Sequence, residues 1–178
     1  MKQEQQLVHD IQHGDRTAMR RLYDLYSGHA MATALRYVPN RDDAADIVQD
    51  AFVKIFSSVG AYEYRGEGML RAWVTRVTAN EALGFLRRRS GLTFTDDIPD
   101  TGPDEDPDVD GISDERLAQL IASLPEGYRV VLNMFVFGGM SHREIADELG
   151  IKPTTSASQF FHAKKMLAQM IKEERKKG

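Results

Sequence analysis

Apolar residues recur at spacings of three and four along most of this chain, which is the spacing of one face of an α-helix. They are concentrated in residues 1–89 and 114–178, where glycine and proline separate one stripe from the next. In the first block we expect four helices, and the apolar stripe of the second includes Tyr23 and Met31. No stretch alternates with the period of two that is typical of a half-buried strand. The pattern therefore predicts an all-α protein.

Residues that favour helix ends place the four helices of the first block. Gly14 suits the position after a helix, and Asp15 can cap the start of the next one. Pro39 interrupts the second stripe, so the third helix is expected to begin near Asp42, an acid suited to a helix N-terminus. The fourth is expected to run from about residue 69 to residue 89.

The strongest local pattern lies in residues 141–166. Ser141 followed by Glu144 is a capping box, Gly150 suits the end of a short helix, and Pro153 suits the first position of another. Two helices joined by a tight glycine turn form a helix-turn-helix, although an ordinary helical hairpin is the alternative. In the DNA-binding interpretation the second helix exposes side chains that can hydrogen-bond to base edges and phosphates, namely Thr155, Ser158, Gln159, His162 and Lys165.

Charge is distributed unevenly along the chain. The net charge of −4 is the sum of about +2 for residues 1–89, −9 for residues 90–114 and +3 for residues 115–178. The central stretch is also rich in proline and glycine, so we interpret residues 90–113 as a flexible acidic linker. Its role is either that of a tether or that of a nucleic-acid mimic that fills a basic channel until RNA or DNA displaces it.

Aromatic and cationic residues alternate through the loop and helix of residues 61–89. Exposed aromatic rings can stack on unpaired bases, and arginines can hold the backbone of a single strand. Trp73 shares a face with Leu70 and Val77, so we place it in the core. For Asn80 the residues alone leave open a structural hydrogen bond or contact with an extruded base.

The third expected helix carries a second face beside its apolar stripe, formed by Asp46, Gln49, Asp50, Val53 and Lys54. This face is either solvated or a site where another protein docks.

Several classes of function are not favoured. The chain has no cysteine, which excludes disulfides, thiolate metal sites and cysteine nucleophiles. No run approaches the roughly 20 apolar residues of a membrane span, and the polar N-terminus is unlike a secretory signal, so we expect a cytoplasmic protein without direct membrane insertion. His9 and His13 have the spacing of a metal pair but no further ligand. We expect neither an enzyme nor a cofactor.

Three segments in succession resemble one family. They are GDRTAMRRLYDLYSGHAMATALRYVPNRDDAADIVQDAFVKIF, YRGEGMLRAWVTRVTANEALGFLRRR and LPEGYRVVLNMFVFGGMSHREIADELGI. Together they resemble the extracytoplasmic-function sigma factors, small two-domain sigma factors of bacterial RNA polymerase. The resemblance implies a region 2 domain in residues 1–89, an acidic linker in residues 90–113 and a region 4 domain in residues 114–178.

The resemblance also implies a role for individual residues. Those that would dock on the polymerase clamp are Asp46, Gln49, Asp50, Phe52 and Lys54. Those that would hold melted minus-ten DNA are Tyr64, Arg65, Arg71, Arg76 and Asn80. Those that would read the minus-thirty-five element are Thr155, Ser158, Gln159, His162 and Lys165. The implied partners are core RNA polymerase, promoter DNA and an inhibitory anti-sigma factor.

The sequence departs from the family in the expected recognition helix, where Ala157 and Gln159 occupy positions that are often basic, and at Tyr64, where the family often has Phe. A recognition helix with fewer cations holds fewer phosphates, which weakens DNA binding and lowers its salt dependence. The expected mechanism is binding without catalysis, in which docking on polymerase places two domains on two promoter elements and flipped bases are trapped. The alternatives are a conventional helix-turn-helix regulator that acts without being a polymerase subunit, and a protein-binding adaptor.

Overall fold

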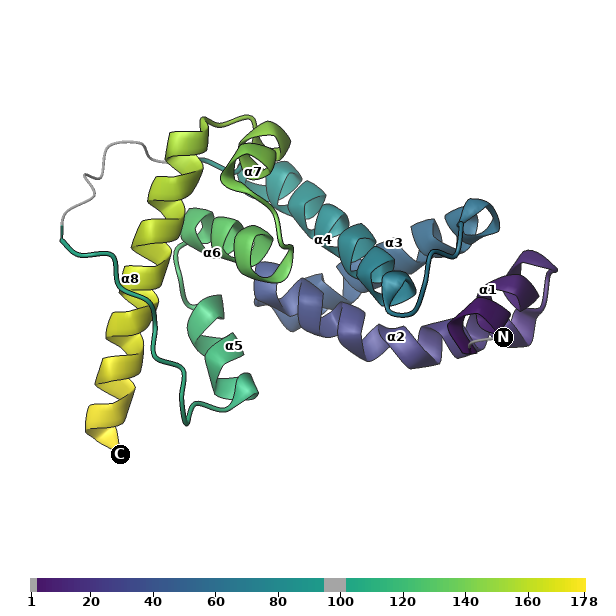
Figure 1. Ribbon diagram of the computed structural model, residues 1–178, viewed down its shortest axis with the longest axis horizontal. Helices are drawn as coiled ribbons and strands as arrows, with labels where there is room; N and C mark the ends of the chain where they lie inside the picture. The colour runs from purple at the N-terminus through teal and green to yellow at the C-terminus, as the bar shows by residue number, and fades with distance from the viewer. Residues whose placement is uncertain (1–2, 95–101) are drawn as a thin grey trace. The chain divides into compact units, whose positions relative to one another are not determined.

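The computed structural model describes residues 3–94 and 102–178, apart from the side chain of Ser90 (Figure 1). The described residues form helices and loops and no strand, which confirms the all-α prediction. The chain divides into two compact units, Met1–Arg89 and Ser90–Gly178. Residues 95–101 of the predicted linker lie outside the described part. None of the described helices has the length and apolar character to cross a bilayer.

Unit 1 follows the helix boundaries that the sequence predicts. Asp15 accepts hydrogen bonds from the backbone nitrogens of Thr17 and Ala18, at 2.8 and 3.3 Å. Asn40 accepts one from the nitrogen of Asp43 at 3.0 Å, so the third helix begins one residue earlier than expected. The elements are α1 (Gln3–Gln12), α2 (Arg16–Tyr37), α3 (Arg41–Ser58), the 3-10 turn η1 (Val59–Ala61) and α4 (Met69–Ser90).

The packing of α2 against α3 forms the centre of unit 1. Ala30 and Ala34 on α2, and Ala44 and Ala51 on α3, are fully buried. Small side chains at a helix contact let the two axes approach closely, because the separation of packed helices depends on the side chains between them. The larger apolar residues therefore fill the space on either side of this contact.

Helix α1 fastens the loop between η1 and α4. The carboxylate of Glu4 accepts a hydrogen bond from the Tyr26 hydroxyl at 2.8 Å and another from the backbone nitrogen of Gly68 at 3.0 Å. The carboxamide of Gln12 donates to the carbonyl oxygen of Tyr62 at 2.9 Å. Two polar side chains of one short helix thus hold both ends of the loop that contains Tyr64 and Arg65.

An ion pair joins α3 to α4. The Lys54 ammonium contacts the carboxylate of Glu81, whose side chain is only 9% exposed. A buried charge that loses its partner is costly because it has already given up its hydration. Lys54 therefore stabilises the packing of α4.

Unit 2 is built around its last helix. Leu120, Ile121 and Leu132 pack in one apolar cluster with Ala163, Leu167 and Ile171 of that helix. The elements are α5 (Asp114–Ala122), α6 (Glu126–Leu132), the π-helix η2 (Asn133–Phe137), α7 (His142–Leu149) and α8 (Pro153–Lys177).

The π-helix η2 ends in a turn that only glycine fits. The nitrogen of Gly138 donates to the carbonyl oxygen of Asn133 at 3.0 Å. A Cβ atom at Gly138 would lie 2.5 Å from the carbonyl oxygen of Met134. The turn redirects the chain into α7.

The helix-turn-helix has the predicted local geometry. The Ser141 hydroxyl and the Glu144 carboxylate form the capping box, and Pro153 occupies the first turn of α8. Gly150 has a φ of +68°, a left-handed conformation that glycine adopts without steric cost.

We expect Lys54→Met to lower the free energy of unfolding of unit 1 by about 1–3 kcal/mol, because it leaves the buried Glu81 carboxylate without its partner. Adding Glu81→Leu should restore most of that stability, since replacing both members of a buried pair with apolar groups is often neutral. Urea denaturation followed by the fluorescence of Trp73, the single tryptophan of the chain, reports on unit 1 alone. Equal stability of Lys54→Met and wild type would contradict this role.

Candidate nucleic-acid and protein-docking interfaces

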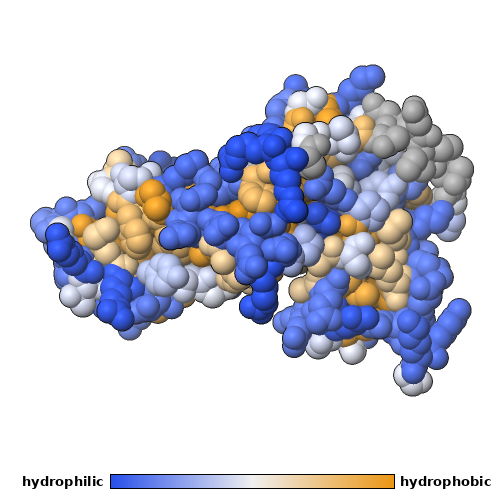
Figure 2. All heavy atoms as spheres, turned by 180° about the vertical axis from the view of Figure 1, so that it is seen from behind, coloured by the Kyte–Doolittle hydropathy of each residue, from blue (hydrophilic) through white to orange (hydrophobic). Residues whose placement is uncertain are grey.

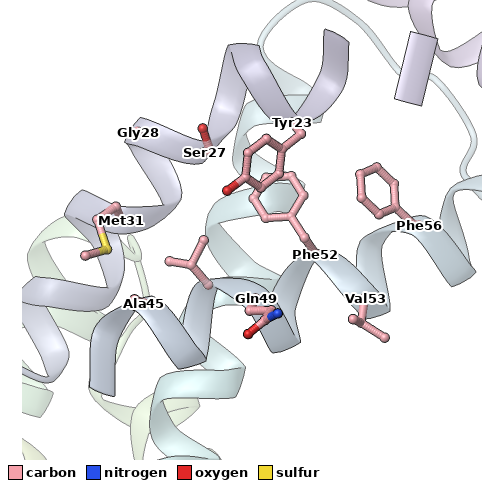
Figure 3. Close-up of a pocket in the computed structure, with 10 residues that line it drawn as sticks. Tyr23, Ser27, Gly28, Met31, Ala45, Gln49, Phe52, Val53 and Phe56 are labelled. Atoms are coloured by element: carbon pink, nitrogen blue, oxygen red, sulfur yellow. The ribbon is translucent and has the colours of Figure 1, made fainter. Parts of the chain in front are cut away.

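An apolar groove of about 640 Å³ lies between α2 and α3 (Figure 3). The Tyr23 ring meets the ring of Phe52 edge to face at 4.9 Å, and Phe56 lies 5.7 Å beyond it. Figure 2 shows one face of the molecule, on which hydrophobic areas are smaller than hydrophilic ones. In the groove, Tyr23 and Val53 are 44% and 65% exposed. The groove is lined by Tyr23, Ser27, Gly28, Met31, Ala45, Val48, Gln49, Phe52, Val53 and Phe56. Exposed apolar surface of this kind marks a site where another molecule docks.

The residues predicted to dock on polymerase fall into three groups. Gln49 and Phe52 line the groove, and Phe52 is buried to 3% exposure. Asp46 and Asp50 are exposed on α3 outside it. Lys54 is engaged with Glu81 of α4.

The part of the groove that α2 contributes was not predicted from the sequence. Tyr23 and Met31 belong to the apolar stripe of the second helix, and both line the groove. Their signal is the width of that stripe, because a surface helix of a small domain needs only one apolar face. An excess of apolar residues on α2 therefore indicates a second contact.

In the loop before α4, Tyr64 is half-buried, and its hydroxyl has no hydrogen-bond partner among the described residues. The Arg65 guanidinium is exposed and lies 3.3 Å from the carboxylate of Glu63. Trp73 is half-buried against the ring of Tyr62, with centroids 4.7 Å apart, so it packs on the loop rather than standing free as a stacking platform.

The residues of α4 that are expected to contact DNA stand on exposed positions. Arg76 and Asn80, one helical turn apart, both face solvent, as contact with DNA requires. Arg71 approaches Nδ1 of His29 on α2 at 3.3 Å. Because Asn80 is exposed, the structure gives no support to its alternative role in a structural hydrogen bond.

A hydrogen-bond chain determines the protonation of His29. The Thr75 hydroxyl donates to the carbonyl oxygen of Arg71 at 2.9 Å, so it accepts from Nε2 of His29 at 2.6 Å. Nδ1 then carries the lone pair that faces the Arg71 guanidinium. Burial lowers the pKa of His29, and the charges of Arg71 and Arg36 lower it further. The neutral imidazole therefore holds Arg71 in place.

In unit 2, His142 connects the two helices of the helix-turn-helix. Its Nδ1 lies 2.9 Å from the Ser156 hydroxyl at the start of α8, and its ring stacks on Phe135 with centroids 4.6 Å apart. Burial lowers the pKa of His142. The contact sets the direction in which α8 leaves the turn.

The prediction that the recognition helix exposes all five candidate side chains is wrong for Thr155 and Gln159, which are 5% and 2% exposed. Gln159 lies against α6, where a Cβ atom at Gly127 would meet its carboxamide oxygen at 2.9 Å and the ring of Phe94 at 3.2 Å. Thr155 precedes the buried Ser156 in the first turn. Helix α8 is packed on more sides than its sequence pattern indicates.

The other three candidates on α8 are half-buried. His162 stacks on Tyr128 of α6 with centroids 5.8 Å apart. Lys165 lies so close to Gly102 that a Cβ atom there would be 2.9 Å from the ammonium. Part of the expected recognition surface thus faces residues of the same unit.

Two protein families match this chain. Residues 22–91 match the family described as Sigma-70 region 2, and residues 114–167 match Sigma-70, region 4. The residues between the two matches, 92–113, include most of the acidic segment.

Curated relatives cover nearly the full chain. The RNA polymerase sigma-H factor of Pseudomonas aeruginosa is 27% identical over 96% of this chain and 94% of its own length. The ECF RNA polymerase sigma-E factor of Haemophilus influenzae is 28% identical over 94% of this chain and 95% of its own. The ECF RNA polymerase sigma factor SigE of Mycolicibacterium smegmatis is 33% identical over 89% of this chain and 64% of its own.

Solved structures share the fold. CnrH in complex with the cytosolic domain of CnrY aligns with a TM-score of 0.50 and 23% identity, over 94% of this chain and 96% of that one. The sigma factor RpoE in complex with the anti-sigma factor NepR from Bartonella quintana aligns with a TM-score of 0.53 and 21% identity, over 86% and 96%.

The stability of unit 1 should fall with acidification because of His29. A histidine whose folded-state pKa is lowered contributes its full stability above its ordinary pKa of 6.5 and loses it as the pH falls through the folded-state value. His29→Gln keeps one donor and one acceptor for Thr75 and Arg71 but does not titrate, so it should reduce the loss of stability below pH 6.5. Denaturation at a series of pH values, read by Trp73 fluorescence, measures the difference. Parallel pH profiles for the variant and wild type would contradict the assignment.

Proposed function

Because this chain belongs to the extracytoplasmic-function sigma factors of the sigma-70 family, and so directs RNA polymerase to promoters, we propose that its two units divide this work between them. Unit 1 docks on core polymerase and holds melted minus-ten DNA. Unit 2 reads the minus-thirty-five element. The observation that carries this proposal is the succession of a region 2 match and a region 4 match on two separate compact units.

The docking surface that we propose for polymerase is the α2–α3 groove together with the exposed carboxylates of Asp46 and Asp50. Apolar side chains such as Val53 give affinity when water is excluded from the groove. The flanking carboxylates favour a partner with complementary positive charge and direct its approach. Gln49 at the rim of the groove supplies a hydrogen-bonding group beside the apolar centre (Figure 3).

Melted minus-ten DNA is held by the loop before α4 and the exposed side of α4. Tyr64 offers a ring for stacking on an unpaired base, and Asn80 offers an amide that pairs with a base edge. Arg65, Arg71 and Arg76 hold the backbone. Flipping a base costs a few kcal/mol, which stacking and hydrogen bonding at such a site offset. Melting therefore draws on binding energy, and the chain acts by binding rather than by catalysis.

For the minus-thirty-five element we propose that α8 enters the major groove with Ser158, His162 and Lys165 nearest the DNA. Thr155 and Gln159 act only after a rearrangement of the residues that cover them. Few cations lie on this part of α8, so its own affinity is low. Linkage to a unit already bound through polymerase raises the effective concentration enough to compensate.

We also propose that an anti-sigma factor binds this chain in the cytoplasm, where the polymerase works. CnrH and RpoE have the same fold and were solved in complexes with CnrY and NepR. The exposed groove of unit 1 is a suitable surface, since a protein that occupies it excludes polymerase.

A change in the lining of the groove tests docking. We expect Val53→Asp to weaken binding to core polymerase about tenfold, since it places a charge in an apolar contact that is desolvated on binding. Leu25→Asp is the matched control, because Leu25 is also exposed on unit 1, at 58%, but does not line the groove. Fluorescence-detected titration of labelled protein with core polymerase measures both. An equal effect in the two variants would argue against the groove.

Run-off transcription with bacterial core polymerase on a genomic fragment library tests the function as a whole. Wild-type protein should produce new start sites that share two spaced promoter elements, and Tyr64→Ala and Asn80→Ala should abolish melting on them. Tyr64→Phe should retain activity, because stacking needs the ring and the hydroxyl has no partner in the described part of the chain. No stimulation on any template, with folded protein that binds duplex DNA by itself, would favour a conventional helix-turn-helix regulator. Absence of both activities would favour the adaptor.

A further inference from the structure

An acidic segment of unit 2 lies along one side of α8 (Figure 1), and we call residues 104–110 the strap. Lys164, which is 13% exposed at its side chain, contacts the carboxylates of Asp104 and Asp106 at 2.8 and 2.9 Å. Lys172 pairs with Glu105. Three consecutive carboxylates of the strap are thus engaged by two lysines of α8.

Arg175 holds the far end of the strap. Its guanidinium donates to the Asp108 carboxylate at 2.8 Å and to the carbonyl oxygens of Asp108 and Asp110 at 3.1 and 2.7 Å. The hydrogen bond from Arg175 lowers the pKa of the Asp108 carboxyl. Bonds to two backbone carbonyls as well as to a carboxylate fix the path of the strap and do more than neutralise charge.

The contacts continue toward the start of α8. Gly102 lies against the Lys165 ammonium, and Phe94 lies beside Gln159 next to Gly127. Described residues that precede α5 therefore contact α8 from Lys164 to Arg175, and Phe94 lies near its second turn. They lie against Lys165 and near Gln159, two of the five positions proposed to read the minus-thirty-five element.

A recognition helix in the major groove runs between two phosphate backbones, so cations on its flanks contact phosphates and set its position. Lys165 is one of the proposed reading positions, and Lys164 is its neighbour in the chain. Arg175 stands ten residues after Lys165, about 15 Å farther along the helix at 1.5 Å per residue. Lys164 is thus close to where a phosphate would lie, whereas Arg175 is remote from it.

We propose that the strap is an autoinhibitory element that occupies the basic flank of α8 and must be displaced before unit 2 binds duplex DNA. Its carboxylates take the place of phosphates on Lys164, and they repel phosphates that approach Lys165. Arg175 keeps it there without taking part in DNA binding. The inference rests on the proposed reading of DNA by α8.

The strap also explains a charge pattern that the proposed function leaves unexplained. Residues 90–114 contain nine acidic and no basic residues, and most of the segment lies between the two family matches. A spacer alone needs length but no such charge. Ion pairs between exposed groups weaken as salt rises, so the inhibition should be strongest at low ionic strength.

The most discriminating experiment removes a positive charge from α8, and we expect DNA binding to become tighter. Arg175→Ala releases the far end of the strap and should strengthen the binding of full-length protein to a mixed-sequence duplex by about threefold, within the range of an exposed ion pair. Lys176→Ala, the matched control, removes the neighbouring cation, which pairs with no described residue of the strap, and should leave binding unchanged or weaker. Fluorescence anisotropy at several salt concentrations measures both, and the gain should shrink as salt rises.

A second variant tests the strap independently of Arg175, by changing the carboxylates of the strap itself. Neutralising Asp104, Glu105, Asp106 and Asp108 to their amides should strengthen duplex binding by more than Arg175→Ala does. Neutralising Asp114, Glu115, Asp147 and Glu173 makes the same change in net charge away from the strap and should give a smaller gain. Circular dichroism confirms that each variant is folded.

The outcomes separate the two proposals. Duplex binding that is the same or weaker in Arg175→Ala overturns the strap and leaves DNA reading by α8 intact. Failure of every variant to bind duplex at low salt, with run-off transcription indifferent to the minus-thirty-five sequence, overturns the role of α8 and the strap with it. Run-off transcription that depends on that sequence, without duplex binding by any free variant, overturns the strap alone.

Discussion

The core of unit 2 forms around α8, so the proposed DNA-reading surface is limited to one side of that helix. Ala163, Leu167 and Ile171 hold α8 against α5 and α6. Ser156 connects it to α7 through His142. With these sides occupied, only a limited arc is left for DNA, and the strap borders that arc. A helix used as both core and recognition surface has few exposed positions, which is why the burial of two predicted contacts matters.

In unit 1, too, the packing of the helices determines which side chains stay exposed. Fully buried alanines bring α2 and α3 together, so the larger side chains beside them cannot all be covered within a small domain. Tyr23 and Val53 remain exposed, and the groove between the helices is the result. Lys54 then joins α3 to α4 through Glu81, which places the proposed docking helix and the proposed DNA-binding helix in one packed unit.

In this chain the local distribution of charge matters more for nucleic-acid binding than the net charge does. The net charge of −4 would argue against nucleic-acid binding, yet α4 and α8 each carry more basic than acidic residues, and residues 90–114 carry nine acids and no base. Described carboxylates of that segment are paired with α8. The same acidic stretch thus accounts for the overall charge and conceals part of the basic surface.

The sequence by itself determined what depends on neighbours in the chain. The caps at Asp15 and Ser141, the glycine at Gly150 and the proline at Pro153 act within a few residues, so helix positions and the helix-turn-helix could be predicted. The three family-like segments identified region 2 and region 4 for the same reason, since each is a continuous stretch. Individual contacts with polymerase and DNA stay predictions.

Only the tertiary structure decided which side of each helix is covered. It buries Gln159 against Gly127, ties Glu4 to Gly68, engages Lys54 with Glu81 and lays the strap on α8. Each contact joins residues more than 20 positions apart, and periodicity within one helix carries no information about what packs on it from a distance.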